Sequence, residues 1–569
     1  MKKDSTMKKI TFLKGTIITT IGIVITKILG LLYVIPFHSI IGDEGGALYG
    51  YAYTIYLFFM SISTAGIPLA ISKIVSEYQT LGYMKAKKRV FTLSKRISLL
   101  LGFVSFLIIM LFSPVIAKGI LGNATGGNSI EDISFVIRVI GTAILIVPVL
   151  SIYRGYFEGH RFMSPPSISQ VIEQLFRVFI IIFGSLSAIK VFHFSISSAV
   201  GIALFGATAG AIISYLYLVN KLRKNKNKFN DKLIKKNEPI VSDKEIFRKL
   251  IIYAVPFIMI DLFKSLYNTI DMVTVVKGLV KVSYSTVDAE TIYSMVSTWG
   301  AKFNMVILAI SSGIIVNLIP NLSSSIVKKD YKGCNDKVIQ SLNILLFLAL
   351  PITFGISFLA KPIWYLFYGN SLYGPNVLSY YIFVGLFMSL ATIVVTILQC
   401  YKDYKGMFIS LSIGVVLKLI LNNNLLYAFN KMSFPAYYGV ITASIIGYFT
   451  TFIIALILLK KKYGVSYENL IKNLVDYICG TVLMIMLLFV IKFFIPIYSS
   501  NRVLNILIIV LYGLVGCFIY FFYAYKAGCF EKIFGKKFIN NIKRVLSFCE
   551  STFLFLYLFV LSKLTNLSP

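Results

Sequence analysis

The amino-acid sequence predicts an all-α polytopic membrane protein with about fourteen transmembrane helices. Of its 569 residues, 57% are hydrophobic and 14% are charged, whereas a soluble domain averages roughly 25% charged residues. Apolar runs recur from end to end, and a run of ~20 residues is long enough to cross ~30 Å of hydrocarbon. Short clusters of lysine and arginine separate the runs. Together these observations exclude a soluble globular domain.

The apolar runs give the predicted spans in chain order. They lie near residues 15–37, 47–71, 92–113, 133–153, 168–189, 196–219, 250–277, 294–319, 338–359, 376–400, 407–429, 437–459, 475–497 and 503–525. The first run is too long for the apolar region of a cleaved signal peptide, and no A-x-A-like site follows it, so we interpret it as an uncleaved helix. The run at 553–561 is too short to span a bilayer and is interpreted as a tail.

The basic residues predict the topology. The net charge is +33, but the cations fall in short clusters between apolar runs and do not form one basic face, so we expect no nucleic-acid partner. Residues 220–249 hold eleven Lys and Arg against four acids, while HSIIGDEGGALYG after the first span has no Lys or Arg. By the positive-inside rule, an even number of spans places both termini and the 220–249 loop in the cytoplasm, in a plasma-membrane protein.

Two weak internal sequence similarities predict that the chain contains a duplication. An offset of 245 residues relates the loop and helix at 151–178 to those at 396–421, and it aligns Glu173 with Lys418. The first segment is an elbow between spans four and five, with two consecutive prolines before the second helix, which is a helix-start signal.

The second similarity relates IPLAISKIVSEY at 67–78 to IPNLSSSIVKKDY at 319–331, with one inserted residue. Both similarities relate segments that lie six predicted spans apart, so the two halves are predicted to be parallel repeats. Substrate sites are then expected between the halves, near the midplane of the membrane. The predicted organisation is a six-helix lobe at 1–219, a basic inter-lobe loop at 220–249, a second six-helix lobe at 250–460, two further helices at 461–525 and a basic cytoplasmic tail at 526–569.

Three segments resemble the MurJ/SpoVB/YtgP group of polysaccharide-biosynthesis flippases, in the multidrug/oligosaccharidyl-lipid/polysaccharide exporter superfamily. They are STAGIPLAISKIVSEY (63–78), the RGYFEGH…SISQVIEQLFR elbow (154–177) and NLIPNLSSSI (317–326). The resemblance covers about residues 10–525. It implies two six-helix lobes and then two helices that border a groove for a lipid tail. It also implies flipping of lipid II, a lipid-linked precursor of peptidoglycan biosynthesis, to the outer leaflet.

The resemblance also implies which cations face the cavity. Related flippases place arginines along helices one, two and eight. Here Lys27, in ITKILG, takes the first position, and Tyr33 stands six residues later, where some members carry another arginine. The helix-two position falls near the apolar Phe59 and Met60, and Lys302 is the helix-eight cation, displaced by about one residue. The pattern matches the Gram-positive branch better than the Gram-negative one.

The predicted seventh span carries the richest polar stripe. Within PFIMIDLFKSLYNTIDMV, the residues Asp261, Lys264, Asn268 and Asp271 are spaced by three, four and three, which places them on one side of an α-helix. A charge within a span costs about 2.5–3.5 kcal/mol on insertion scales and usually faces a cavity. Asp261 and Asp271 are candidates for ion coupling or gating. The alternative is that Asp261 and Lys264 simply neutralise each other.

The elbow supplies the other candidate charges. Arg154, Glu158, Glu173 and Arg177 are predicted to lie at the cytoplasmic rim, where Glu173 and Arg177 share one helix face. Two interpretations remain open for these four side chains: a structural latch between helices, or a gate.

These residues together predict a flippase that moves a lipid-linked oligosaccharide between leaflets by alternating access. Lys27, Lys264 and Lys302 are expected to bind the undecaprenyl diphosphate-sugar head as point-charge donors. Sodium ion and proton are the candidate coupling ions, and we expect a monomer in the lipid bilayer. We find no Walker A, H-E-x-x-H or D-x-D motif, so the sequence predicts no enzyme, catalytic residue, metal or cofactor.

Three alternatives stay open. The first is a flippase for another wall polysaccharide or a spore-cortex precursor in sporulation. The second is a drug or cation exporter of the same superfamily. The third belongs to a different class, a membrane-embedded wall-synthesis enzyme or scaffold.

Overall fold

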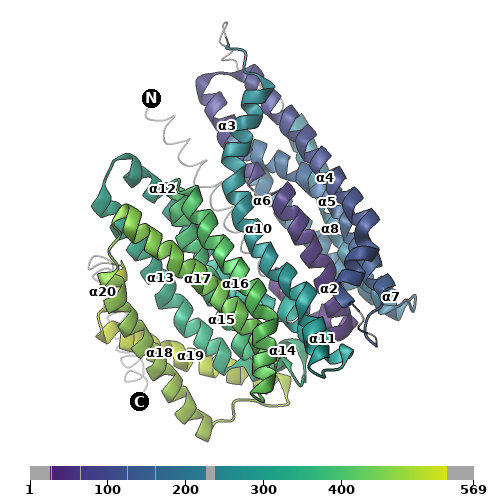
Figure 1. The fold of residues 1–569 in the computed structure, drawn as a ribbon, viewed down its shortest axis with the longest axis vertical. Coiled ribbons are helices and arrows are strands. Elements are labelled where there is room, and N and C mark those ends of the chain that lie inside the picture. Colours follow the sequence, from purple (N-terminus) through teal and green to yellow (C-terminus); the bar gives the residue numbers. More distant parts are fainter. Residues whose placement is uncertain are drawn as a thin grey trace, which may run out of the picture. The chain divides into compact units, whose positions relative to one another are not determined.

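The computed structural model describes residue 26 and residues 29–64, 66–122, 124, 126–160, 162–225 and 238–534. Every regular element in these ranges is a helix (Figure 1). The elements before the basic loop are α2 (Val34–Ser63), α3 (Ile67–Leu81), α4 (Met84–Leu121), α5 (Ile130–Gly159), α6 (Ser164–Phe179), the π-helical turn η1 (Ile180–Gly184), α7 (Ser185–Lys190) and α8 (Ile196–Lys224).

The elements after the basic loop are α10 (Asp243–Lys281), α11 (Thr286–Ser294), the π-helical turn η2 (Met295–Trp299), α12 (Ala301–Val327), α13 (Tyr331–Phe358), α14 (Ala360–Tyr368), α15 (Gly374–Cys400), α16 (Tyr404–Lys431), α17 (Tyr437–Tyr463), α18 (Glu468–Phe494), α19 (Arg502–Lys526) and α20 (Cys529–Phe534).

Twelve helical stretches of the described residues are long and apolar enough to cross a membrane. They match predicted spans two to six and eight to fourteen. Most of the first predicted span lies outside the described residues. The seventh is one helix, α10, of 39 residues, and its predicted span carries four charged side chains, which lower its apolar character. The predicted class, an all-α multi-pass membrane protein, is confirmed.

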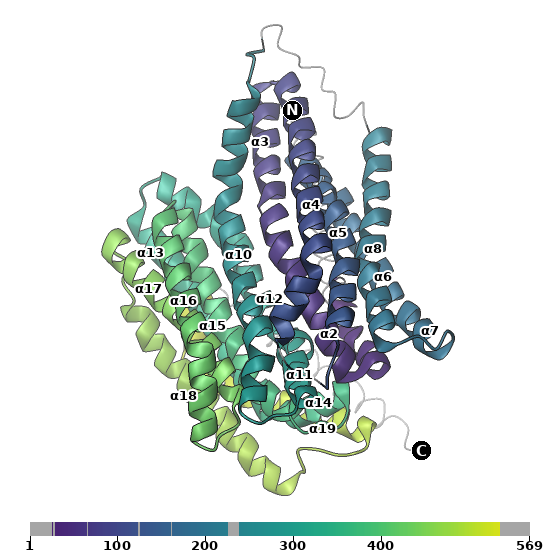
Figure 2. The ribbon, with the colours of Figure 1, turned by 45° about the vertical axis from the view of Figure 1, so that its right-hand side comes forward.

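The helices pack into two compact units. Unit 1 comprises the described residues of Met1–Leu308 and Ile363–Leu459, and unit 2 those of Ala309–Pro362 and Lys460–Pro569. In unit 1, α5 packs against both α4 and α8, and α10 packs against α3 and α16 (Figure 2). In unit 2, α18 packs against α13 and α19. The division into two six-helix lobes stays a prediction.

The predicted second span, 47–71, is not one continuous helix. α2 ends at Ser63, and Gly66 adopts a left-handed conformation with φ 74° before α3 begins at Ile67. A side chain at Gly66 would meet the carbonyl oxygen of Ala254 and Cβ of Phe257 in α10. The break occurs because only glycine tolerates both the positive φ and this close approach. Hydropathy alone does not reveal such a turn.

The elbow is held on α3 by small residues. α5 ends at Gly159, and α6 begins at Ser164 with proline in its first turn, as the sequence predicted. A Cβ at Gly155 would collide with the backbone of Pro68, and a Cβ at Gly159 would collide with Val75. Glycines at this spacing let two helix backbones approach closely.

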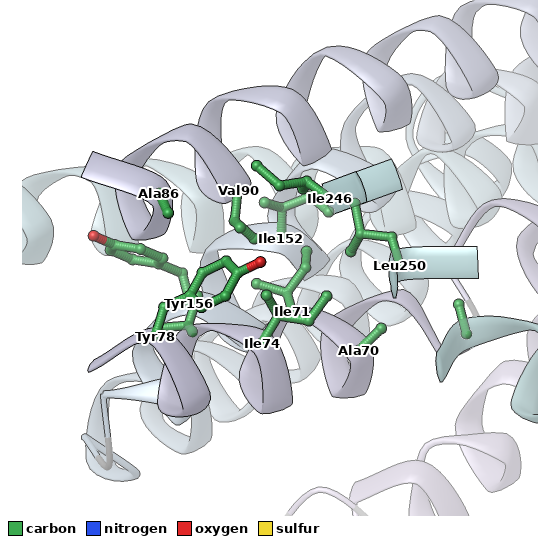
Figure 3. Packing of buried hydrophobic residues seen from close by; sticks show 12 residues of the cluster. Ala70, Ile71, Ile74, Tyr78, Ala86, Val90, Ile152, Tyr156, Ile246 and Leu250 are labelled. Atoms are coloured by element: carbon green, nitrogen blue, oxygen red, sulfur yellow. The ribbon is translucent and has the colours of Figure 1, made fainter. Parts of the chain in front are cut away.

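An apolar cluster fixes the N-terminal end of α10 (Figure 3). Ile246 and Leu250 of α10 pack with Ile71 and Ile74 of α3, and Tyr156 of α5 belongs to the same cluster. Ile246, Ile71 and Ile74 have no exposed surface. α10 is therefore anchored on helices that precede the basic loop, while its C-terminal part supplies the ionic contacts described below.

Candidate functional site

Lys302 lies in the first turn of α12, where it is positioned by an aromatic side chain. Its Nζ donates a hydrogen bond to the hydroxyl of Tyr33 over 3.0 Å and lies 5.1 Å from the centre of the Tyr33 ring. Tyr33 is itself buried, with 7% of its surface exposed. No carboxylate pairs with Lys302 in the described part of the chain. A partly buried ammonium held by a neutral ring keeps its charge available for an anion.

Aromatic packing holds Tyr33 in place. Its ring centre lies 6.1 Å from that of Phe37, which in turn lies 5.3 Å from Tyr49 and 6.0 Å from Trp299. Trp299 is fully buried in η2, directly before the turn that carries Lys302. The same cluster thus fixes both partners of the Lys302–Tyr33 contact.

The polar stripe of α10 divides into two environments. The side chain of Asp261 is 54% exposed, and its carboxylate lies 3.9 Å from Nζ of Lys264, which is 27% exposed. Asn268 is also exposed, whereas Asp271 is buried. The ion pair between Asp261 and Lys264, which the sequence left open as an alternative, is therefore long and partly exposed, whereas Asp271 is buried in the protein.

Asp271 belongs to a buried ionic network with Lys418 of α16. Nζ of Lys418 lies 2.5 Å from Oδ1 of Asp271, and it donates to Oδ1 of Asn422 over 2.7 Å, the carbonyl oxygen of Val440 over 3.1 Å and Oγ of Ser444 over 2.6 Å. Lys418 has no exposed surface. The network joins α10, α16 and α17, and it neutralises the carboxylate within the helix bundle.

A second buried network links the elbow to α8. Glu173 accepts hydrogen bonds from Arg154 over 2.7 Å and from Arg177 over 2.8 Å. Arg154 also donates to Oγ of Ser214 on α8 over 3.2 Å. All three charged side chains are about one-seventh exposed. Glu158 forms no ion pair in the described residues, so the structure brings together three of the four predicted elbow charges.

The two networks occupy equivalent positions of the predicted repeat. The offset of 245 residues that aligns Glu173 with Lys418 also aligns Arg177 with Asn422. Each pair is four residues apart on its helix, and each pair is in direct contact. At these aligned positions α6 carries the part-buried Glu173 and α16 the buried Lys418, which have opposite charge.

Some predicted and observed site residues do not coincide. Lys27 lies outside the described residues. No contact in the described ranges joins Lys264 to Lys302, so a cavity shared by the three lysines stays a prediction. Sequence reasoning missed the role of Lys418, although a lysine inside the predicted span 407–429 was a sufficient signal. It also missed Glu290, which lies before the predicted start of span eight.

Comparison with known proteins places the chain in a family. The model of the family described as polysaccharide biosynthesis protein matches residues 12–324. The chain is 32% identical over 542 residues to the lipid II flippase MurJ of Bacillus subtilis (strain 168), an alignment that covers 92% of this chain and 97% of that protein. The chain belongs to the polysaccharide biosynthesis protein family.

Other members and folds are similar at lower identity. Stage V sporulation protein B of Bacillus subtilis (strain 168) is 26% identical over 345 residues, which cover 60% of this chain and 63% of that protein. Among solved structures, the lipid II flippase MurJ in an inward closed conformation gives a TM-score of 0.65 at 16% identity, covering 91% of this chain and 99% of that one. An inward-facing multidrug resistance MATE family transporter gives a TM-score of 0.60 at 13% identity, covering 78% of this chain and 98% of that chain. These structures show that this family member has the fold of such transporters.

Proposed function

We propose that this protein is a lipid II flippase that moves an undecaprenyl diphosphate-linked cell-wall precursor from the inner to the outer leaflet by alternating access. The observation that carries the proposal is the 32% identity to MurJ of Bacillus subtilis along 92% of the chain. The protein acts as a transporter rather than an enzyme, and as a monomer.

The environment of Lys302 supports an anionic substrate. Its ammonium faces the phenol of Tyr33 and no carboxylate within the described ranges. A diphosphate can therefore accept hydrogen bonds from its remaining N–H groups. The membrane potential favours export of such a head, because moving one negative charge outward gains ~2.3 kcal/mol per 100 mV. ATP is not required when the loaded carrier moves as net negative charge.

Reconstitution tests this function directly. Purified protein in liposomes that contain fluorescent lipid II is expected to expose the lipid to an impermeant reagent on the opposite leaflet, faster than protein-free liposomes do. Equal rates with and without the protein contradict the proposal. A parallel assay with a spore-cortex lipid precursor addresses the second candidate, which the likeness to stage V sporulation protein B favours.

The elbow triad is proposed to be a latch. Because Glu173 binds both arginines inside the protein, Glu173→Gln leaves two buried cations unneutralised, and breaking a buried pair costs about 3–5 kcal/mol. We expect a lower apparent melting temperature in detergent. Glu158→Gln is the matched control, since Glu158 has no ion pair among the described residues, and it should melt like the parent. A Glu173→Gln protein with parental melting and altered transport rate indicates a gate instead.

Asp261 remains the candidate for ion coupling. Of the two carboxylates on the α10 stripe, Asp261 is exposed, whereas Asp271 is buried and paired with Lys418, so Asp261 is the one that can exchange a sodium ion or proton. Asp261→Asn is expected to remove the dependence of flipping on an imposed sodium or proton gradient. Asn268→Ala, an exposed polar change on the same stripe, is the control. Retention of the full dependence by Asp261→Asn excludes this role.

The topology is proposed to be that of the positive-inside rule, with cytoplasmic termini and a cytoplasmic 220–249 loop. In a protein without its native cysteines, Asn230→Cys is expected to resist an impermeant thiol reagent added to intact cells. Phe192→Cys, at an exposed position between α7 and α8, is the control and should react. Reaction of Asn230→Cys from outside contradicts the topology.

A further inference from the structure

The contact between α2 and α11 is close and centred on a buried carboxylate. A side chain at Gly46 would collide with Trp299, and one at Gly50 would collide with Ser297, both in the turn η2 that directly follows α11. Two glycines one turn apart therefore let α2 touch the end of this helix. Thr298 donates a hydrogen bond to the carbonyl oxygen of Gly46 over 3.0 Å. We call this contact, together with Glu290 and its partners, the α2–α11 joint.

Glu290 connects three segments of the joint. Its Oε2 accepts hydrogen bonds from the backbone N–H and from Nδ2 of Asn128, both over 2.9 Å, and its Oε1 lies 3.3 Å from the hydroxyl of Tyr51. Only 2% of Glu290 is exposed. A Cβ at Gly127 would collide with the carboxylate, so the loop before α5 reaches Glu290 only because that position is glycine.

No positive charge balances this carboxylate in the described residues. The titratable groups that face it are Tyr51 and Glu44 of α2, and Tyr293 of α11 stacks on Tyr51 with ring centres 4.5 Å apart. Glu44 is itself acidic and repels a negative Glu290. Burying an ionised carboxylate without a cation is costly, so the joint is more stable when Glu290 is neutral.

The geometry accommodates both protonation states. An ionised Glu290 accepts from all three donors. A protonated Glu290 keeps the two bonds from Asn128 to Oε2, and its Oε1–H donates to the phenol oxygen of Tyr51, because a phenol both donates and accepts. A proton can therefore bind without rearrangement of the closed joint.

We propose that Glu290 is a proton-binding site that controls whether α2 and α11 stay together. Protonation holds the joint closed, and loss of the proton favours separation, because the ionised carboxylate is then hydrated by water that enters the joint. One proton changes the ratio of closed to open joint by at most about tenfold per pH unit.

Distance measurements on the full-length protein test this proposal without any lipid substrate, so its failure is distinguishable from failure of the flippase proposal. Spin labels at Ser39→Cys of α2 and Val287→Cys of α11, both exposed, report its opening in a protein without native cysteines. Between about pH 5 and about pH 9 the parent should shift toward longer distances. Glu290→Gln, which imitates the protonated side chain, should give the short distance throughout.

Two further variants keep the test decisive. Glu290→Asp retains a titrating carboxylate and should retain a pH response. Asn128→Ala removes a donor that favours the ionised form, so the midpoint of the response should rise. A Glu290→Gln protein that responds to pH like the parent, or an Asn128→Ala protein with an unchanged midpoint, overturns the proposal.

Discussion

Replacing Lys302 with alanine is expected to lower the rate of lipid II flipping by about 10- to 100-fold. A hydrogen bond to a charged group contributes about 1.5–3 kcal/mol, and each 1.4 kcal/mol corresponds to a factor of ten. Lys302 is partly buried and has no carboxylate partner among the described residues, so its loss removes the donor that we propose for the diphosphate and leaves no other charge unneutralised. The rate is measured in liposomes with fluorescent lipid II.

Two variants control for indirect effects. Lys302→Arg keeps the charge and should retain most of the rate. Tyr33→Phe keeps the ring beneath the ammonium and removes only the hydroxyl, so it should change the rate little. The double variant Lys27→Ala/Lys302→Ala should show no flipping while it remains folded. Normal growth of cells that depend on that double variant is incompatible with the assignment.

Replacing Lys418 with methionine is expected to destabilise the protein by about 3–5 kcal/mol. Methionine is similar in size, but it leaves the carboxylate of Asp271 buried without its cation, which is the costly way to break a buried pair. Asn422 and Ser444 also lose the ammonium that they bind. The change is measured as a lower unfolding midpoint in detergent with increasing denaturant.

The double variant Lys418→Met/Asp271→Asn identifies the cause. It removes both charges, so it should recover much of the stability that the single change loses, because a neutral pair has no unbalanced charge to bury. Lys405→Met, a charge removal at an exposed position on the same helix, should have little effect. Equal stability of the single variant and the parent means that Asp271 and Lys418 are not coupled.

The order of the membrane-spanning helices in the described residues was predictable because hydrocarbon thickness sets a length that apolar runs reveal. Their ends were less predictable. The predicted start of α10 at 250 is seven residues later than the observed start at Asp243, because only its apolar part was counted. The capping pattern was visible in the sequence, since Ser242 accepts a hydrogen bond from the backbone N–H of Glu245.

A helix start predicted too late also left Glu290 out of the candidate site residues. Span eight was predicted to begin at 294, but α11 begins at Thr286, with Ser285 accepting from the backbone N–H of Asp288. The capping pattern marks that start, and it places Glu290 inside a helix rather than in a loop. A buried carboxylate there was therefore open to prediction from local signals.

The partners of the charges were not predictable in this way. Asp271 and Lys418 come from helices far apart in the sequence, and no spacing rule joins them. Their contact depends on how α10 packs against α16, which helix periodicity does not specify. The ion pair of the elbow was easier to predict, because Glu173 and Arg177 are four residues apart on one helix and their contact follows from helical geometry.

The π-helical turn before Lys302 has a consequence for the evolution of this helix. The N–H of Gly300 bonds the carbonyl oxygen of Met295, five residues earlier, so the turn holds one residue more than an α-helical turn does. Removing that residue would restore an α-helical turn, and the helix on either side would keep its orientation. An insertion absorbed in this turn displaces the cation by one position in an alignment while both ends of the membrane helix stay in place. A helix that is one residue shorter here can therefore keep its cation at the same place in the bundle.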